Sequence, residues 1–160
     1  MQNLSKLLQT LADAGLEFVI VGGFAATTHG SSYVTRDIDV CAVLTDETIA
    51  QLRQALAGWN PKHRMTPQRL SFLTYPPAGA PVRNLYLETD LGIVDILTEV
   101  LGVGDFARLR SRADELQVEG RRYCVMSLED LIQAKEALGR EKDLLTAKEL
   151  RAIAAKRQQR

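Results

Sequence analysis

The segment from Phe18 to Val43 constrains the fold more than any other part of the chain, because strand-like runs flank a glycine turn within it. The apolar run Phe18–Val21 predicts a buried strand. Gly22-Gly23 follows directly, and the small residues behind this pair favour a tight passage from strand into helix. A second strand is predicted from Asp37 to Leu44. We therefore expect a strand, a glycine turn, a short helix and a second strand to lie together at the centre of the fold.

The remaining sequence mixes helical and strand-like patterns. A capping sequence at Ser127–Asp130 predicts the start of a late helix that Gly139 ends. The turn-like sequences Thr89–Gly92 and Glu119-Gly120 each predict a hairpin. The expected helices are Gln2–Ala14, Phe24–Thr28, Asp46–Ala57, Phe106–Ser111, Ser127–Leu138 and 140–160, and the expected strands are Glu17–Val21, Asp37–Leu44, Leu70–Thr74, Asn84–Glu88, Ile93–Thr98, Leu116–Val118 and Arg122–Val125. Such a mixture indicates an α+β fold with a mixed β-sheet flanked by helices.

Length, charge and cysteine content limit the class of protein. A chain of 160 residues is one domain, and its twenty basic and twenty acidic residues cancel, so no overall field attracts nucleic acid or a membrane. Residues 146–160 are locally basic, which is typical of a solvated helix end and also allows a modest contact with a polyanion. Cys41 and Cys124 are expected to be buried free thiols in a reducing compartment. Without a signal-peptide pattern or a membrane-length apolar run, a cytoplasmic location is expected.

Three aspartates form the strongest candidate site. Asp37 and Asp39 share one face of the second predicted strand, about 7 Å apart, and on their own they are best explained as solvated carboxylates. Asp95 interrupts the apolar run Ile93–Leu97, where a lone carboxylate needs a partner or a metal ion. If this strand lies beside the Asp37 strand, the three carboxylates converge into an oxygen-rich site suited to Mg²⁺. Two ions about 4 Å apart in such a site activate an attacking hydroxyl and stabilise a leaving pyrophosphate.

Glycine and basic residues supply candidate nucleotide contacts. The Gly22-Gly23 turn presents backbone N–H groups to a phosphate, although a strand-to-helix turn often needs glycine for backbone reasons alone. Lys135 and Lys142 fall on one apolar face if the late helix continues through Gly139. Their ammonium groups then reach either an anionic ligand or bulk water. Arg36 precedes the aspartates and can pair with them or with a phosphate.

The two histidines do not predict a metal site. His29 is expected to shape the turn after the short helix, and His63 is expected to lie in a surface loop. No Cys/His spacing suits zinc, and no Ser-His-Asp set can be argued from the sequence. The aspartates therefore remain the leading candidates for chemistry.

The arrangement of these residues resembles that of the DNA polymerase β-like nucleotidyltransferase superfamily. In that pattern a strand, a Gly-Gly or Gly-Ser turn and an Asp-hydrophobic-Asp sequence are followed by a third Asp on a later strand. Here these are Gly22-Gly23, Asp37-Ile38-Asp39 and Asp95. The sequences GGFAATTHG, TRDIDV and LEDLIQAKEALGREKDLLTAKEL look like those of minimal bacterial nucleotidyltransferases, including members of toxin–antitoxin systems. Glycine at position 23 replaces a common serine, which removes one hydroxyl contact.

The resemblance implies a nucleotidyltransferase fold with a core over residues 1–126 and a C-terminal helical segment, 127–160, packed on it. It implies Mg²⁺ as the cofactor. The implied catalytic metal ligands are Asp37, Asp39 and Asp95, and the implied phosphate contacts are Gly22, Gly23, Lys135 and Lys142, to which the position of Arg36 adds a further candidate.

The leading hypothesis is an enzyme that moves a nucleoside monophosphate from an NTP to a hydroxyl group on tRNA, protein or a small molecule. The alternative is a non-catalytic nucleotide-binding or antitoxin-like partner protein with the same fold. A third alternative is a small α/β domain whose acidic residues are merely solvated. The sequence leaves the NTP, the acceptor and the oligomeric state open.

Overall fold

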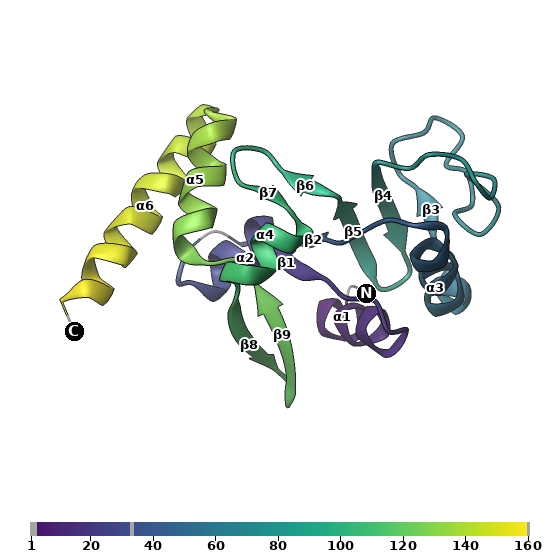
Figure 1. The fold of residues 1–160 in the computed structure, drawn as a ribbon, viewed down its shortest axis with the longest axis horizontal. Helices are drawn as coiled ribbons and strands as arrows, with labels where there is room; N and C mark the ends of the chain where they lie inside the picture. Colours follow the sequence, from purple (N-terminus) through teal and green to yellow (C-terminus); the bar gives the residue numbers. More distant parts are fainter. Residues whose placement is uncertain (1–2, 33, 160) are drawn as a thin grey trace.

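The computed structural model describes residues 3–32 and 34–159 and arranges them as a sheet with helices packed around it (Figure 1). The helices are α1 Leu4–Asp13, α2 Gly22–Thr28, α3 Asp46–Leu56, α4 Phe106–Arg112, α5 Leu128–Leu138 and α6 Glu141–Gln158, with a 3-10 turn at Ala57–Trp59. The strands are β1 Val19–Val21, β2 Asp37–Cys41, β3 Lys62–His63, β4 Asn84–Thr89, β5 Gly92–Leu97, β6 Glu99–Val100, β7 Gly104–Asp105, β8 Asp114–Val118 and β9 Arg121–Val125. None of the described helices combines the length and apolar character needed to cross a membrane.

The main sheet has seven strands in the order β3-β4-β5-β2-β1-β9-β8. β2 runs parallel to β5 and β1 runs parallel to β9, whereas the other neighbouring strands are antiparallel. Both predicted hairpins are present, as β4–β5 and β8–β9. β6 and β7 form a separate small hairpin. The α+β architecture with a mixed sheet is therefore confirmed.

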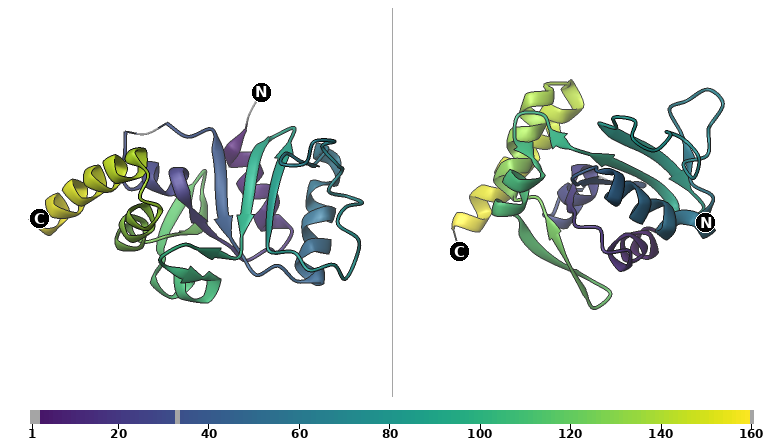
Figure 2. Two further views of the ribbon diagram at one scale, coloured as in Figure 1. Left: turned by 90° about the horizontal axis from the view of Figure 1, so that it is seen from above. Right: turned by 45° about the vertical axis from the view of Figure 1, so that its right-hand side comes forward.

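One face of the sheet packs on α1 and α3, which lie side by side (Figure 2). The apolar positions at helical spacing on these two helices are buried in the core: Leu7, Leu8 and Leu11 on α1, and Ile49, Leu52 and Leu56 on α3. The central strands contribute Ile38, Val40, Val94 and Ile96 to the same core. Because side chains alternate along a strand, the intervening aspartates of β2 and β5 lie on the opposite face. The three predicted site aspartates thus project from the face of the sheet that α1 and α3 do not cover.

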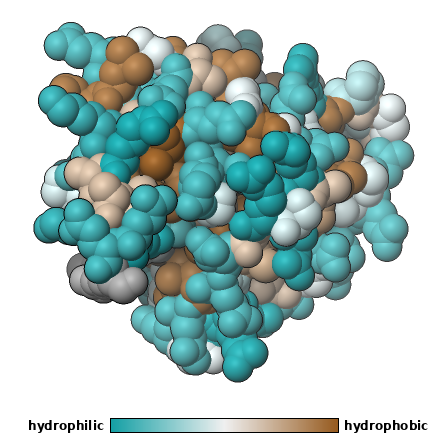
Figure 3. Space-filling model, turned by 60° about the vertical axis from the view of Figure 1, so that its left-hand side comes forward, coloured by the Kyte–Doolittle hydropathy of each residue, from teal (hydrophilic) through white to brown (hydrophobic). Residues whose placement is uncertain are grey.

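The two C-terminal helices form a helical hairpin rather than one continuous helix. α5 ends at Leu138, where Gly139 takes the left-handed conformation with φ of 70°, and α6 begins at Glu141. The predicted helix end at Gly139 is therefore confirmed. α6 folds back against α5, and α5 in turn packs beside α2. Figure 3 shows this side of the molecule as mostly hydrophilic, with small and separate apolar patches.

The predicted strand at Leu70–Thr74 is wrong, because this segment forms only an isolated β-bridge from Ser71 to Lys62 and then a turn. Its apolar character comes from Phe72, which is fully buried and whose backbone O accepts a hydrogen bond from Arg53 Nε at 2.7 Å. The edge strand of the sheet is instead β3. His63 lies on β3 and is buried, with its Nε2 2.7 Å from the backbone O of Tyr75, so the expected surface position of His63 is also wrong.

The other predicted elements are present with bounds shifted at their ends. The predicted start of the first helix at Gln2 and the last residue of the chain lie outside the described residues. The expectation of buried free thiols is confirmed for Cys41, whereas Cys124 is free but only partly buried.

Candidate active site

The three predicted aspartates occupy neighbouring strands. Asp37 and Asp39 lie on β2, and Asp95 lies on β5. The two strands pair in parallel with Asp39 opposite Asp95, so these carboxylates project from the same face of the sheet. Val21, the last residue of β1, lies opposite Asp39 on the other side. Asp95 therefore lies beside β2 as expected, and its role in a site stays a prediction.

Gly22-Gly23 turns β1 directly into α2. Gly22 has a φ of +68°, a left-handed conformation that favours glycine. A Cβ atom at this position would also overlap the carboxylate of Asp39. Gly22 is thus required by the backbone conformation and by the space that Asp39 occupies, and the phosphate contacts predicted for both glycines stay predictions.

A cavity of about 390 Å³ brings the aspartate pair together with the C-terminal helices. Its first wall consists of Gly23, Ala26, Thr35, Asp37 and Asp39, and its second wall consists of Lys135, Arg140, Lys142, Asp143, Leu145 and Thr146. The lysines face the aspartates because α6 folds back on α5, and not because the two lysines share one helical face. The predicted residues that do not line this cavity are Gly22, Arg36 and Asp95, of which Arg36 is exposed.

Negative charge at the aspartates is only partly compensated. Burial, followed by the charges of Asp95 and Asp37, raises the pKa of Asp39 to about 6. The positive charges of Lys135 and Arg64 act in the opposite direction without cancelling this rise. Burial also raises the pKa of Asp95. A bound cation would offset this repulsion, because an opposite charge favours the ionised form of a carboxylate.

Asp143 organises the basic wall of the cavity. Its carboxylate is 2% exposed, accepts a hydrogen bond from Arg140 Nε at 2.5 Å, and lies 3.7 Å from Lys135 Nζ. The hydrogen bond from Arg140 holds the pKa of Asp143 below its usual value. One acidic side chain thus orders two basic ones, and with Lys142 the wall keeps an excess of positive charge.

The loop that leads into β2 is fixed by α6. Ser31 Oγ donates to Glu149 Oε1 at 2.6 Å, and Ser32 Oγ donates to Glu149 Oε2 at 2.7 Å. Glu149 follows Lys142 by two helical turns, so it lies on the same side of α6. The helix that lines the cavity therefore also anchors the approach to Asp37.

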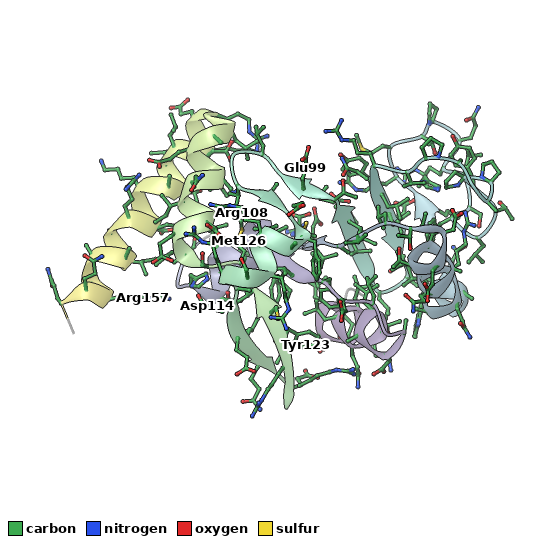
Figure 4. The ribbon with its side chains drawn as sticks, in the orientation of Figure 1. Glu99, Arg108, Asp114, Tyr123, Met126 and Arg157 are labelled. Carbon is green, nitrogen blue, oxygen red and sulfur yellow. The ribbon has the colours of Figure 1, made fainter. Side chains whose placement is uncertain are left out.

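His29 joins the end of α2 to three other elements, through Met126, Asp114 and Arg157, which are labelled in Figure 4. Its Nε2 lies 2.8 Å from the backbone O of Met126, which follows β9, and 3.9 Å from Asp114 Oδ2 on β8. Arg157, near the end of α6, donates to His29 Nδ1 at 3.2 Å. These contacts give His29 a structural role, in agreement with the expected turn-shaping role.

Arg64 is the main site residue that sequence reasoning missed. Its Nε donates to Asp95 Oδ1 at 3.0 Å, and its NH2 group donates to Asp95 Oδ2. The local sequence PKHRMT contains no motif or periodicity that marks this arginine. Only the pairing of β3, β4 and β5 brings Arg64 to Asp95.

Asp37 and Asp39 fit a divalent cation as they stand. Asp95 fits one only if Arg64 releases it. Two crowded carboxylates beside a basic wall are the hard oxygen donors that Mg²⁺ prefers. Within 3–32 and 34–159, however, no three His, Cys, Asp or Glu side chains converge as a ready-made metal site. Both oxygens of Asp95 are engaged by Arg64. Asp95 therefore joins the other two carboxylates only if it exchanges this partner.

Comparison with solved structures identifies the fold. LnuA, a lincosamide antibiotic adenylyltransferase determined with lincomycin bound, matches with a TM-score of 0.57 and 16% identity over 94% of this chain and 95% of that chain. TM1012 from Thermotoga maritima, provisionally described as a nucleotidyltransferase, matches with a TM-score of 0.54 and 18% identity over 93% of this chain and 94% of that chain. The antibiotic-resistance factor ANT(2'')-Ia matches with a TM-score of 0.50 and 15% identity over 98% of this chain and 93% of that chain.

No family model and no curated protein matches the sequence. The likeness therefore lies in the structure, across almost the whole length of each pair of chains. The protein therefore has the nucleotidyltransferase fold, which it shares with LnuA and TM1012.

Proposed function

We propose that this protein is a divalent-cation-dependent nucleotidyltransferase that moves a nucleoside monophosphate from an NTP to a hydroxyl group. The observation that carries this proposal is the single cavity in which Asp37 and Asp39 face Lys135, Arg140 and Lys142. A nucleoside triphosphate with its cation presents negative oxygens to the basic wall and positive charge to the carboxylates. The adenylyltransferase activity named for LnuA, which shares the fold, supports the same proposal.

The residues proposed for the site, in the cavity and beside it, divide into two groups. Lys135 and Lys142, together with the backbone at Gly22 and Gly23, bind triphosphate oxygens, while exposed Arg36 is a weaker candidate for the same contact. Asp37, Asp39 and Asp95 would hold Mg²⁺, which when bound neutralises phosphate charge and favours ionisation of the acceptor hydroxyl. The acceptor oxygen forms a bond to the α-phosphorus as the bond to pyrophosphate breaks, and Asp95 helps to take up the hydroxyl proton.

We further propose that the acceptor is a small molecule. LnuA is a lincosamide antibiotic adenylyltransferase whose structure holds lincomycin, and ANT(2'')-Ia is an antibiotic-resistance factor. The zero net charge of this chain also favours a small acceptor over a long nucleic acid. A tRNA or a partner protein is the other acceptor class, which the sequence resemblance to toxin–antitoxin nucleotidyltransferases suggests, and the same experiment distinguishes the two classes.

The proposal is tested by incubating the protein with Mg²⁺ and each α-³²P-labelled NTP in turn. Separate reactions contain total cell RNA, total cell protein, or a panel of lincosamides and aminoglycosides. Gels resolve labelled macromolecules and thin-layer chromatography resolves labelled small molecules. We expect label on a small molecule with the wild type and none with Asp37→Asn. Asp90→Asn, in the exposed turn between β4 and β5, is the matched control and should retain full transfer.

Each other outcome changes the proposal in a defined way. Label on RNA or protein overturns the small-molecule acceptor and keeps the transferase. A thermal shift with Mg·NTP but no transfer to any acceptor favours the non-catalytic nucleotide-binding alternative. The absence of both transfer and thermal shift overturns the function altogether.

A further inference from the structure

Arg64, Tyr86, Asp95 and Asp39 form one row across the sheet. The backbone N of Arg64 donates to the backbone O of Tyr86 at 3.0 Å. Tyr86 lies opposite Asp95, and Asp95 lies opposite Asp39. The guanidinium carbon of Arg64 is 5.6 Å from the centre of the Tyr86 ring. The arginine therefore extends over Tyr86 and reaches the carboxylate on the next strand.

The ion pair occupies the whole carboxylate of Asp95. Arg64 Nε donates to one oxygen at 3.0 Å, and its NH2 group donates to the other. A two-pronged guanidinium–carboxylate contact of this kind is strong and fixes the orientation of both groups. The side chain of Asp95 is only 12% exposed, so water cannot fully replace a partner that leaves. In its ionised form, Asp95 therefore needs a positively charged partner.

Arg64, in contrast, has access to water. Its side chain is 27% exposed, and it directly follows β3, a two-residue strand at the edge of the sheet. The next residue, Met65, is 66% exposed. A long arginine side chain at such an edge can rotate its charged end into solvent while its aliphatic part stays packed. Separation of the ion pair therefore costs Asp95 more free energy than it costs Arg64, because water can solvate the arginine.

We propose that Arg64 and a divalent cation are alternative partners of Asp95, so that Arg64 neutralises this carboxylate until a cation displaces it. The inference rests on the proposed function, because it concerns the same cation. Two positive groups on one carboxylate repel each other, so the cation drives Arg64 towards solvent. The cation therefore binds the three carboxylates more weakly than it would if Arg64 were absent. Arg64 is a positioning residue that acts through Asp95.

The test is a titration with Mn²⁺ alone, in which free Mn²⁺ is measured by electron paramagnetic resonance. Arg64→Gln removes the positive charge and the two-pronged guanidinium contact with Asp95. Because charge-assisted pairs are strong, the dissociation constant for Mn²⁺ should fall by about tenfold or more. Arg69→Gln is the matched control, because Arg69 also pairs with a carboxylate near the same edge, donating from its NH1 group to both oxygens of Glu88. It should leave the dissociation constant unchanged. In a background of Asp95→Asn, the Arg64→Gln effect should vanish.

A second measurement uses the wild-type protein, so it does not depend on whether an Arg64 or Asp95 variant folds. Titration with Mg²⁺ should shift the Nε–H resonance of Arg64 in a nitrogen–proton correlation spectrum and leave that of Arg69 in place. Equal Mn²⁺ affinity in wild type and Arg64→Gln, or weaker binding by the variant, overturns the inference and leaves the proposed function standing. An unmoved Arg64 resonance in Mg²⁺-saturated protein also overturns it. If neither metal binds the wild type, the cation in the proposed function is wrong as well.

Discussion

Asp39→Asn should stabilise the protein when no divalent cation is present. Burial and the charges of Asp95 and Asp37 raise the pKa of Asp39 from 3.8 to about 6. At about 1.36 kcal/mol for each pKa unit, ionised Asp39 costs the folded state about 3 kcal/mol at a pH above both values. Asparagine has nearly the same shape without the charge. We therefore expect the free energy of unfolding of the variant to exceed that of wild type by about 2–3 kcal/mol at neutral pH in EDTA.

The pH dependence of this difference has a defined sign. Between 3.8 and about 6, the folded wild type keeps a proton on Asp39 that the unfolded chain has lost. Its stability contribution from this group therefore rises as the pH falls through that window. The Asp39→Asn variant lacks the titrating group. The advantage of the variant is thus largest above about pH 6 and disappears near the ordinary value of 3.8.

Urea unfolding followed by circular dichroism, at neutral pH and near pH 4, measures both effects. Asp90→Asn, an exposed position, is the control and should leave the free energy of unfolding nearly unchanged. Added Mg²⁺ should stabilise the wild type and not Asp39→Asn, because a ligand stabilises only the state that binds it. A variant no more stable than wild type at neutral pH in EDTA would refute the view that burial and the neighbouring carboxylates destabilise ionised Asp39.

Two further substitutions test the basic wall of the cavity and the glycine turn beside Asp39. Lys135→Gln should weaken binding of a non-hydrolysable Mg·NTP analogue by about tenfold, because it removes a charged partner of the triphosphate. Calorimetry measures the affinity for the analogue, with Lys148→Gln, on the exposed side of α6, as the control. Equal affinities of the two variants would show that Lys135 does not contact the triphosphate. Gly22→Ala and Gly120→Ala both place alanine at a positive φ, of +68° and +81°, but only a Cβ at Gly22 meets a neighbour, the Asp39 carboxylate. Urea unfolding should therefore show a loss of about 1–2 kcal/mol for Gly120→Ala and a larger loss for Gly22→Ala, whereas equal losses would contradict the steric argument.

Features set by neighbouring residues were predictable from the sequence. The β4–β5 and β8–β9 hairpins follow from their turn sequences, and the end of α5 follows from Gly139 in a left-handed conformation. The pairing of β5 with β2 was predictable for a different reason. A single carboxylate in an apolar strand needs partners, and Asp37 and Asp39 on another strand were the natural ones.

Features set by distant strand pairing were not predictable in the same way. Arg64 reaches Asp95 only because β3 pairs with β4 and β4 with β5. The apolar segment Leu70–Thr74 looked like a strand because Phe72 is a core residue, yet a buried side chain can also project from a turn. Lys135 and Lys142 were singled out by a continuous helical face that the chain does not form, and the helical hairpin brings them to the cavity instead.

The central position of β1 has a consequence for the order in which the molecule assembles. One edge of this strand pairs with β2, close in sequence, and the other pairs with β9, where Val19 lies opposite Cys124. The second pairing must close a loop that contains about two thirds of the chain, which makes folding slow relative to proteins with mostly local contacts. The aspartate wall of the cavity lies within this loop, near its start, and the basic wall lies beyond its end. On a ribosome, the aspartate wall therefore emerges long before the basic wall, and its crowded carboxylates spend that interval without their lysine partners.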